Sequence, residues 1–101
     1  MAQFKIVWSN LAATQRKEVF EYWNNRNGNT KYSLKLLKTI QARMKLIAVY
    51  SKMGIRTNYR DIFVSHLGDY SIFYRVTDNE IHVALFWDNR QDPEKIAKLL
   101  S

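Results

Sequence analysis

The chain is limited first by what it lacks. Its 101 residues include no cysteine, one proline, three glycines and two histidines. The absence of cysteine excludes a disulfide framework and thiolate chemistry, and two histidines as far apart as His66 and His82 do not suggest a metal site. There is no secretory signal pattern and no apolar run of membrane-spanning length. We therefore expect a cytoplasmic protein with no membrane contact, no metal and no small-molecule cofactor.

Acidic residues are scarce as well. Nine Asp and Glu stand against sixteen Lys and Arg, which gives a net charge of +7. A field of that sign attracts polyanions such as nucleic acid, the ribosome or an acidic protein segment, although surplus lysine also serves solubility. Hydrophobic residues make up 47% of the chain, which is ample for the core of a single domain spanning residues 1–101.

The first half of the chain has helical periodicity after one short strand over residues 4–8. A helix is predicted from Asn10 to about Asn25, and Gly28 is suited to end it in the left-handed region. A second helix is predicted from Asn29 or Thr30 to about Tyr50, which makes the two an antiparallel hairpin. The inner face of the second helix is predicted from residues spaced four, three, four and three apart: Ser33, Leu37, Ile40, Met44 and Ile47.

The second half reads as a meander of three strands, at about Tyr59–His66, Tyr70–Thr77 and Glu80–Trp87, followed by a short helix for which Asp92 is the N-cap and Pro93 the first position. In the last strand one face is predicted from alternate apolar residues: Ile81, Val83, Leu85 and Trp87. The predicted fold is α+β in the order β-α-α-β-β-β-α, with the helices packed on one face of a small antiparallel sheet.

Five pieces of the sequence carry a family resemblance: Phe4–Ala12 opening into the hairpin, Gly54, Tyr59–Val64, Tyr70–Val76 and the closing Phe86–Arg90. In their order, spacing and total length they resemble the RelE/ParE superfamily of toxins from bacterial type II toxin–antitoxin modules. The resemblance covers nearly the whole chain, and it is the combination of pieces that is specific.

The resemblance implies one of two activities. RelE-like toxins cut mRNA in the ribosomal A site, through attack of a 2′-OH on the adjacent phosphate, and ParE-like toxins poison DNA gyrase without being enzymes. We take mRNA cleavage as the main hypothesis and gyrase poisoning as the alternative. A non-toxic basic RNA-binding domain is a third hypothesis, although no RNA-binding motif is evident. The resemblance also implies an acidic antitoxin with a flexible segment that folds over the toxin, at the sheet edge or on the outer face of the helical hairpin.

The same resemblance implies candidate site residues. RNA cleavage needs a base, an acid and a cation for the phosphorane charge. Arg90 stands after the last strand at the place of a family arginine, Arg60 is expected in a middle strand, and His66 is available for acid–base work. The residues expected to bind the target are Lys52, Arg56 and Arg75.

Two departures favour the alternative activity. Ser71 stands where RelE-like enzymes often carry arginine, and the terminal segment 93–101 has no Tyr or His. The helices are also long, as in ParE-like members.

The arginines have ordinary structural interpretations too. Arg90 is placed to cap the terminal helix or to pair with Asp88 or Asp92. The two strand arginines, Arg60 and Arg75, are placed to pair across strands with Asp61 or Glu80.

Overall fold

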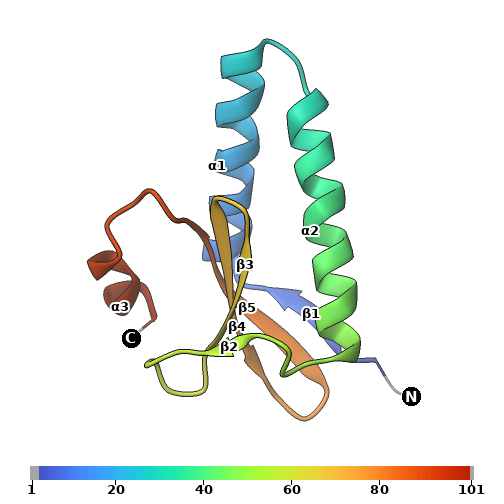
Figure 1. Cartoon of the computed structure of the whole chain (residues 1–101), viewed down its shortest axis with the longest axis vertical. Helices are drawn as coiled ribbons and strands as arrows, with labels where there is room; N and C mark the ends of the chain where they lie inside the picture. The colour runs from blue at the N-terminus through green and yellow to red at the C-terminus, as the bar shows by residue number, and fades with distance from the viewer. Residues whose placement is uncertain (1–2, 101) are drawn as a thin grey trace.

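Two long helices stand side by side over a twisted sheet, and a third, short helix lies apart from them (Figure 1). The structure is a computed structural model and describes residues 3–100. Its elements are β1 (Lys5–Trp8), α1 (Asn10–Asn27), α2 (Lys31–Val49), β2 (Ile55–Arg56), β3 (Phe63–Leu67), β4 (Tyr70–Val76), β5 (Glu80–Asp88) and α3 (Glu94–Leu100). The predicted α+β class and the helical hairpin are confirmed.

The hairpin begins and ends where local chemistry requires. Ser9 is the N-cap of α1, and its hydroxyl accepts a hydrogen bond of 3.0 Å from the Ala12 N–H. Gly28 ends the helix at φ 68°, a conformation that glycine adopts without a steric penalty. On α2 the buried leucine is Leu36, and the predicted Leu37 is only half-buried. Either leucine fits a helical stripe, so the packing against the sheet decides which one is buried.

The sheet has five strands in the order β1-β5-β4-β3-β2. The meander is antiparallel as predicted, but β1 pairs with β5 in parallel, so the sheet is mixed and the prediction of a purely antiparallel sheet is wrong. The strand predicted to begin at Tyr59 begins only at Phe63. Residues 57–62 form a loop in which Asp61 has a positive φ of 60°, and the two-residue strand β2 precedes it at the sheet edge.

A β-bulge in β5 divides that strand into two parts. Ala84 has no residue opposite it, because the register with β4 shifts at this point. The opposing pairs on either side of the shift are Phe73 with Leu85 and Tyr74 with Val83. Ser9 binds the bulge from the start of α1: its N–H donates to the Val83 carbonyl at 3.0 Å and its hydroxyl to the Ala84 carbonyl at 3.1 Å.

The extra residue reverses the direction of the side chains that follow it. Ile81 and Val83 belong to the core under the hairpin, whereas Leu85 and Trp87 belong to a second cluster with Ile96 of α3. The predicted single face of four residues is therefore wrong. The sheet is covered on both faces, by the hairpin on one and by α3 on the other, which corrects the prediction that all helices lie on one face.

Candidate functional site

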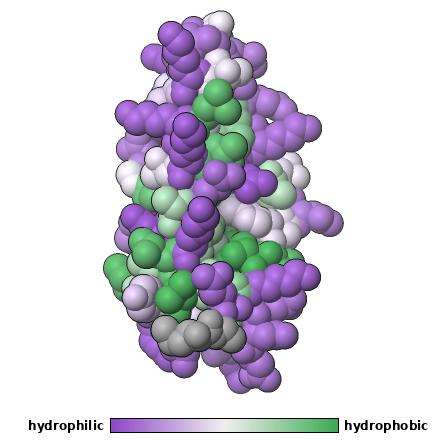
Figure 2. Space-filling model, turned by 90° about the vertical axis from the view of Figure 1, so that its right-hand side faces the viewer, coloured by the Kyte–Doolittle hydropathy of each residue, from purple (hydrophilic) through white to green (hydrophobic). Residues whose placement is uncertain are grey.

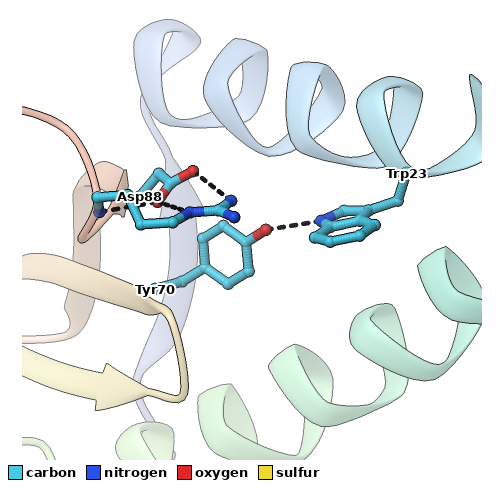
Figure 3. A network of polar contacts seen from close by, with 4 residues as sticks. Trp23, Tyr70 and Asp88 are labelled. Atoms are coloured by element: carbon cyan, nitrogen blue, oxygen red, sulfur yellow. Dashed lines mark hydrogen bonds and ion pairs between the residues drawn. The ribbon is translucent and has the colours of Figure 1, made fainter. Parts of the chain in front are cut away.

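Arg90 lies just beyond β5 and is bound by a carboxylate. Its Nε and Nη2 donate to the two oxygens of Asp88 at 3.0 and 2.8 Å, and its backbone N–H donates to Asp88 Oδ1 at 3.0 Å (Figure 3). The hydrogen bonds from Arg90 hold the pKa of the Asp88 carboxyl below its usual value, and Asp88 in turn raises the pKa of Arg90. Both groups are therefore charged at neutral pH. Of the structural interpretations considered from the sequence, the pairing with Asp88 is the one observed.

A groove opens beside this pair, between α1 and the end of β5. It has a volume of about 320 Å³, and Tyr70 is one of its lining residues. The Tyr70 hydroxyl accepts a 2.8 Å hydrogen bond from the Trp23 indole N–H (Figure 3). Burial raises the pKa of Tyr70, which keeps the hydroxyl protonated at neutral pH. Within residues 3–100, Arg90 is the one Lys or Arg that lines the groove, beside the carboxylates of Glu18 and Asp88. The groove is thus not a strongly cationic site.

His66 takes part in a chain of hydrogen bonds that the sequence did not suggest. Its Nδ1 lies 2.8 Å from the hydroxyl of Ser71, which is itself buried and donates to Asn89 Oδ1 at 2.7 Å. Because the Ser71 proton is given to Asn89, the Ser71 oxygen accepts from His66 Nδ1–H, and Nε2 is the basic nitrogen of the neutral ring. The only sequence signal was a His and a Ser placed symmetrically about the turn between two strands.

The expected catalytic residues are not brought together. Arg90 shares its groove with Tyr70, whereas His66 binds Ser71, and consecutive strand residues point to opposite faces of a sheet. Arg60 was predicted to lie in a strand, and this prediction is wrong. Arg60 lies in the loop of residues 57–62, where its side chain is 96% exposed and its Nε is 3.7 Å from Asp61 Oδ2.

The three expected target-binding residues do meet in space. Lys52, Arg56 and Arg75 line one cleft of about 530 Å³, which we call the basic cleft. Lys52 follows α2, Arg56 lies in the edge strand β2 and Arg75 in the central strand β4. All three side chains are exposed, and the guanidinium of Arg56 lies 5.4 Å from the centre of the Phe63 ring.

The cations of the basic cleft are not neutralised by neighbours as Arg90 is. Within residues 3–100, none of Lys52, Arg56 and Arg75 forms an ion pair. The predicted pairing of Arg75 with Glu80 is absent, because the Glu80 carboxylate lies 3.0 Å from Nε2 of His82 instead. Two carboxylates, of Asp61 and Asp78, also line the cleft.

The two regions lie at opposite ends of β4. Tyr70, beside Arg90, is the first residue of that strand, and Arg75 is its sixth. Five residues of extended strand span about 17 Å, so the groove and the cleft cannot contact the same phosphate group.

A third hollow is apolar and lies on the side of the molecule where α2 and β1 are seen in Figure 1. Figure 2 looks onto that side and shows hydrophobic side chains gathered in its lower half among hydrophilic ones. The hollow has a volume of about 540 Å³, and we call it the apolar groove. Its apolar lining is Phe4, Ile6, Trp8, Ile40, Met44 and Ala48. Arg16 and Lys45 also line it, and the Arg16 guanidinium lies 4.2 Å from the centre of the Trp8 ring.

Two kinds of feature are absent from the part of the chain that the structure describes. No group of three or more His, Cys, Asp or Glu side chains is placed to hold a metal ion. No helix is both long and apolar enough to cross a membrane.

Comparison with known proteins gives one family and one fold. Residues 6–93 match the family model described as the ParE toxin of the type II toxin–antitoxin system, parDE. Among solved structures, a chain from the chromosomal ParDE toxin–antitoxin system of P. aeruginosa superimposes with a TM-score of 0.73. The two share 17% sequence identity over 85% of this chain and 96% of that one. No curated protein matches the sequence significantly.

Proposed function

Because the chain belongs to the ParE toxin family of type II toxin–antitoxin systems, we propose that it arrests growth by binding and poisoning DNA gyrase in the cytoplasm, without cleaving RNA. The observation that carries this proposal is the state of Arg90. Both oxygens of Asp88 receive hydrogen bonds from Nε and Nη2 of Arg90, so the charge that would stabilise a phosphorane is already balanced by a carboxylate, although the Nη1 donors remain available.

The separation of the other candidates supports the same proposal. Arg90 and His66 belong to opposite faces of the sheet, and Arg60 is in a distant loop. General acid–base catalysis needs its groups within hydrogen-bond reach of one reacting centre. A poison that works by surface complementarity has no such requirement, and the exposed Arg90 beside Tyr22 and Gln91 suits a protein interface, where arginine and tyrosine are enriched.

The test is a pair of assays on the purified protein: supercoiling by purified gyrase, and primer extension on mRNA in a translating extract. We expect supercoiling to be inhibited and the mRNA to stay intact. Arg90→Ala should weaken the inhibition, since an arginine at an interface centre contributes about 2 kcal/mol or more. Arg26→Ala, which removes an exposed arginine from the far end of α1, is the matched control and should retain full potency. Cuts at codon positions with normal supercoiling would refute the proposal.

Ribosome-associated mRNA cleavage is retained as a second candidate because of His66. The chain from His66 through Ser71 to Asn89 fixes one nitrogen of the ring and leaves the other as the base, which is how a general base is oriented. If the protein is a nuclease, Ser71→Ala should reduce the cleavage rate while His66→Ala abolishes it. Gyrase inhibition should be insensitive to both changes.

The antitoxin partner that the family implies is proposed to be an acidic segment with apolar anchors in the apolar groove. The groove lies beside the edge strand β1, and its two cations suit an acidic chain. The net charge of +7 should make the association rate fall as ionic strength rises. Lys45→Glu should slow association with the cognate antitoxin more than Lys38→Glu, which makes the same charge change on α2 outside the groove. Equal slowing by the two variants would show that only the overall charge matters.

A further inference from the structure

The basic cleft is separate from the Arg90 groove, and gyrase binding through Arg90 does not use it. We propose that it binds the phosphate backbone of duplex DNA, so that the toxin docks on gyrase together with the DNA that gyrase holds. This inference rests on the proposed function for its biological setting, but the binding of DNA by the cleft is a property of this chain alone.

The first argument is the convergence of unpaired charge. Lys52, Arg56 and Arg75 come from three separate segments, line the same cleft, and have no ion-pair partner within the described residues. In most proteins exposed cations are interspersed with acids, and here Arg90 shows that pattern. The three cations outnumber the carboxylates of Asp61 and Asp78 that line the same cleft, and none is held in an ion pair. The cleft therefore has a net positive potential, and a polyanion that binds there releases its condensed counterions.

The second argument concerns what kind of anion fits. The Arg56 guanidinium lies over the Phe63 ring, and the Arg56 side chain is exposed in the cleft. A planar guanidinium binds phosphate through two parallel hydrogen bonds, whereas Lys52 supplies a mobile point charge. This combination suits a row of phosphate groups that have to be held in register but not read for sequence.

The third argument separates duplex DNA from single strands and from protein. Single strands are bound through exposed aromatic faces on which bases stack. The two aromatic residues of the cleft are Phe63, which is buried, and Phe4, which is half-buried. A protein tail with apolar anchors has a better site in the apolar groove. The basic cleft therefore fits a backbone whose bases are already paired and turned inward.

The experiment measures the binding of the full chain to a fluorescein-labelled duplex of mixed sequence by fluorescence anisotropy over a series of salt concentrations. The slope of log K against log salt is negative, and each phosphate neutralised adds about 0.9 to its magnitude, so a cleft with three cations should give a magnitude of about 2.7. Arg75→Gln and Arg56→Gln should each lower this magnitude by about 1 and weaken binding to all duplex sequences equally. Thermal unfolding monitored by circular dichroism verifies that each variant is folded.

The matched control is Arg26→Gln, which removes the same charge from the hairpin tip. It should leave the slope almost unchanged. Equal losses from Arg26→Gln and Arg75→Gln would overturn the proposal, because attraction would then come from the net charge and not from the cleft. Tighter binding to the corresponding single strand, full competition by an acidic peptide of equal charge at equal concentration, or no binding at low salt would overturn it as well.

Gyrase supercoiling assays separate this proposal from the function proposed above. If gyrase is not inhibited but duplex binding depends on the cleft, the function fails and the DNA site stands. If gyrase is inhibited and Arg75→Gln leaves both the inhibition and the DNA affinity unchanged, the function stands and the DNA site fails.

Discussion

The two ends of β4 present arginines of very different availability. At the Tyr70 end, Arg90 is bound through two nitrogens to Asp88 and its groove also contains Glu18. At the Arg75 end, three cations share a cleft with Asp61 and Asp78, but none of the three is in an ion pair within residues 3–100. Arg90 had the stronger case for binding phosphate from the sequence, but its charge is balanced by Asp88. An arginine's use thus depends on which carboxylate lies next to it, and pairing with Asp88 makes Arg90 an interface residue more readily than a phosphate ligand.

The largest expected effect comes from the residue that positions the basic cleft. Gly54 lies between Lys52 and Arg56, and a Cβ added there would meet the Tyr74 hydroxyl at 2.6 Å and the Val64 carbonyl at 2.9 Å. Gly54→Ala should therefore destabilise the protein by about 1–3 kcal/mol through overpacking, measured by urea unfolding. It should also weaken duplex binding while gyrase inhibition through Arg90 changes less.

The control for that prediction uses the same contact. In a Tyr74→Phe background the hydroxyl is gone, so the added methyl group should cost less than it does in the wild type. Strictly additive losses would show that the clash with the Tyr74 hydroxyl is not the cause.

A second prediction compares one tyrosine hydroxyl at each end of β4. Both side chains are buried, but Tyr74 accepts a 3.0 Å hydrogen bond from the Gly54 N–H, whereas Tyr70 accepts from Trp23 and lines two grooves. Tyr74→Phe should cost about 1–3 kcal/mol, because it leaves a backbone donor without a partner. Tyr70→Phe should cost only about 0.5–1.5 kcal/mol, because water can replace the lost hydroxyl. The two free energies of unfolding are measured in urea, and the reverse order would contradict this account.

A third prediction concerns a substitution that removes the ion pair of Arg90, and with it the difference in charge balance between the two ends of β4. Asp88→Asn releases Arg90 from its carboxylate and should create another phosphate contact, raising the magnitude of the salt slope of duplex binding by about 1. Glu21→Gln makes the same change in net charge on the exposed side of α1 and serves as the control. If both variants bind DNA alike, the pairing with Asp88 does not restrain Arg90.

The smallest effect is expected in acid. Because the folded pKa of Asp88 is lowered, chiefly by the hydrogen bond from Arg90, its contribution to stability is present above the unfolded pKa of about 4 and is lost as pH falls through the folded value. The difference in unfolding free energy between wild type and Asp88→Asn should therefore narrow between about pH 6 and about pH 3. A constant difference over that range would show that the Asp88 charge contributes nothing.

Much of the fold could be predicted because it depends on residues close together in the chain. Ser9 and Gly28 start and stop α1 through contacts within four residues, and Asp92 accepts from the Glu94 N–H at the start of α3. The three-strand meander was predicted from the alternation of apolar residues and from the turn residues between the strands. These interactions are present in any conformation in which the local segment folds, so they can be read from the sequence in order.

The family could be predicted too, since it depends on the order of such segments. The prediction that failed was which face of the sheet each residue of β5 lies on. One bulge at Ala84 moved Leu85 and Trp87 to the face that α3 covers, and periodicity alone does not show an extra residue.

The site was decided by tertiary structure. The Arg90–Asp88 pair joins residues two apart and was one of the pairings that the sequence offered. That Ser71 joins His66 to Asn89, and that Lys52 and Arg75 share a cleft, depend on where the chain returns. The sequence by itself determined the residue types, the net charge of +7 and the local elements. Only the packed sheet decided which charges are neutralised, because Coulomb energy and hydrogen bonding depend on distances between atoms and not on separation along the chain.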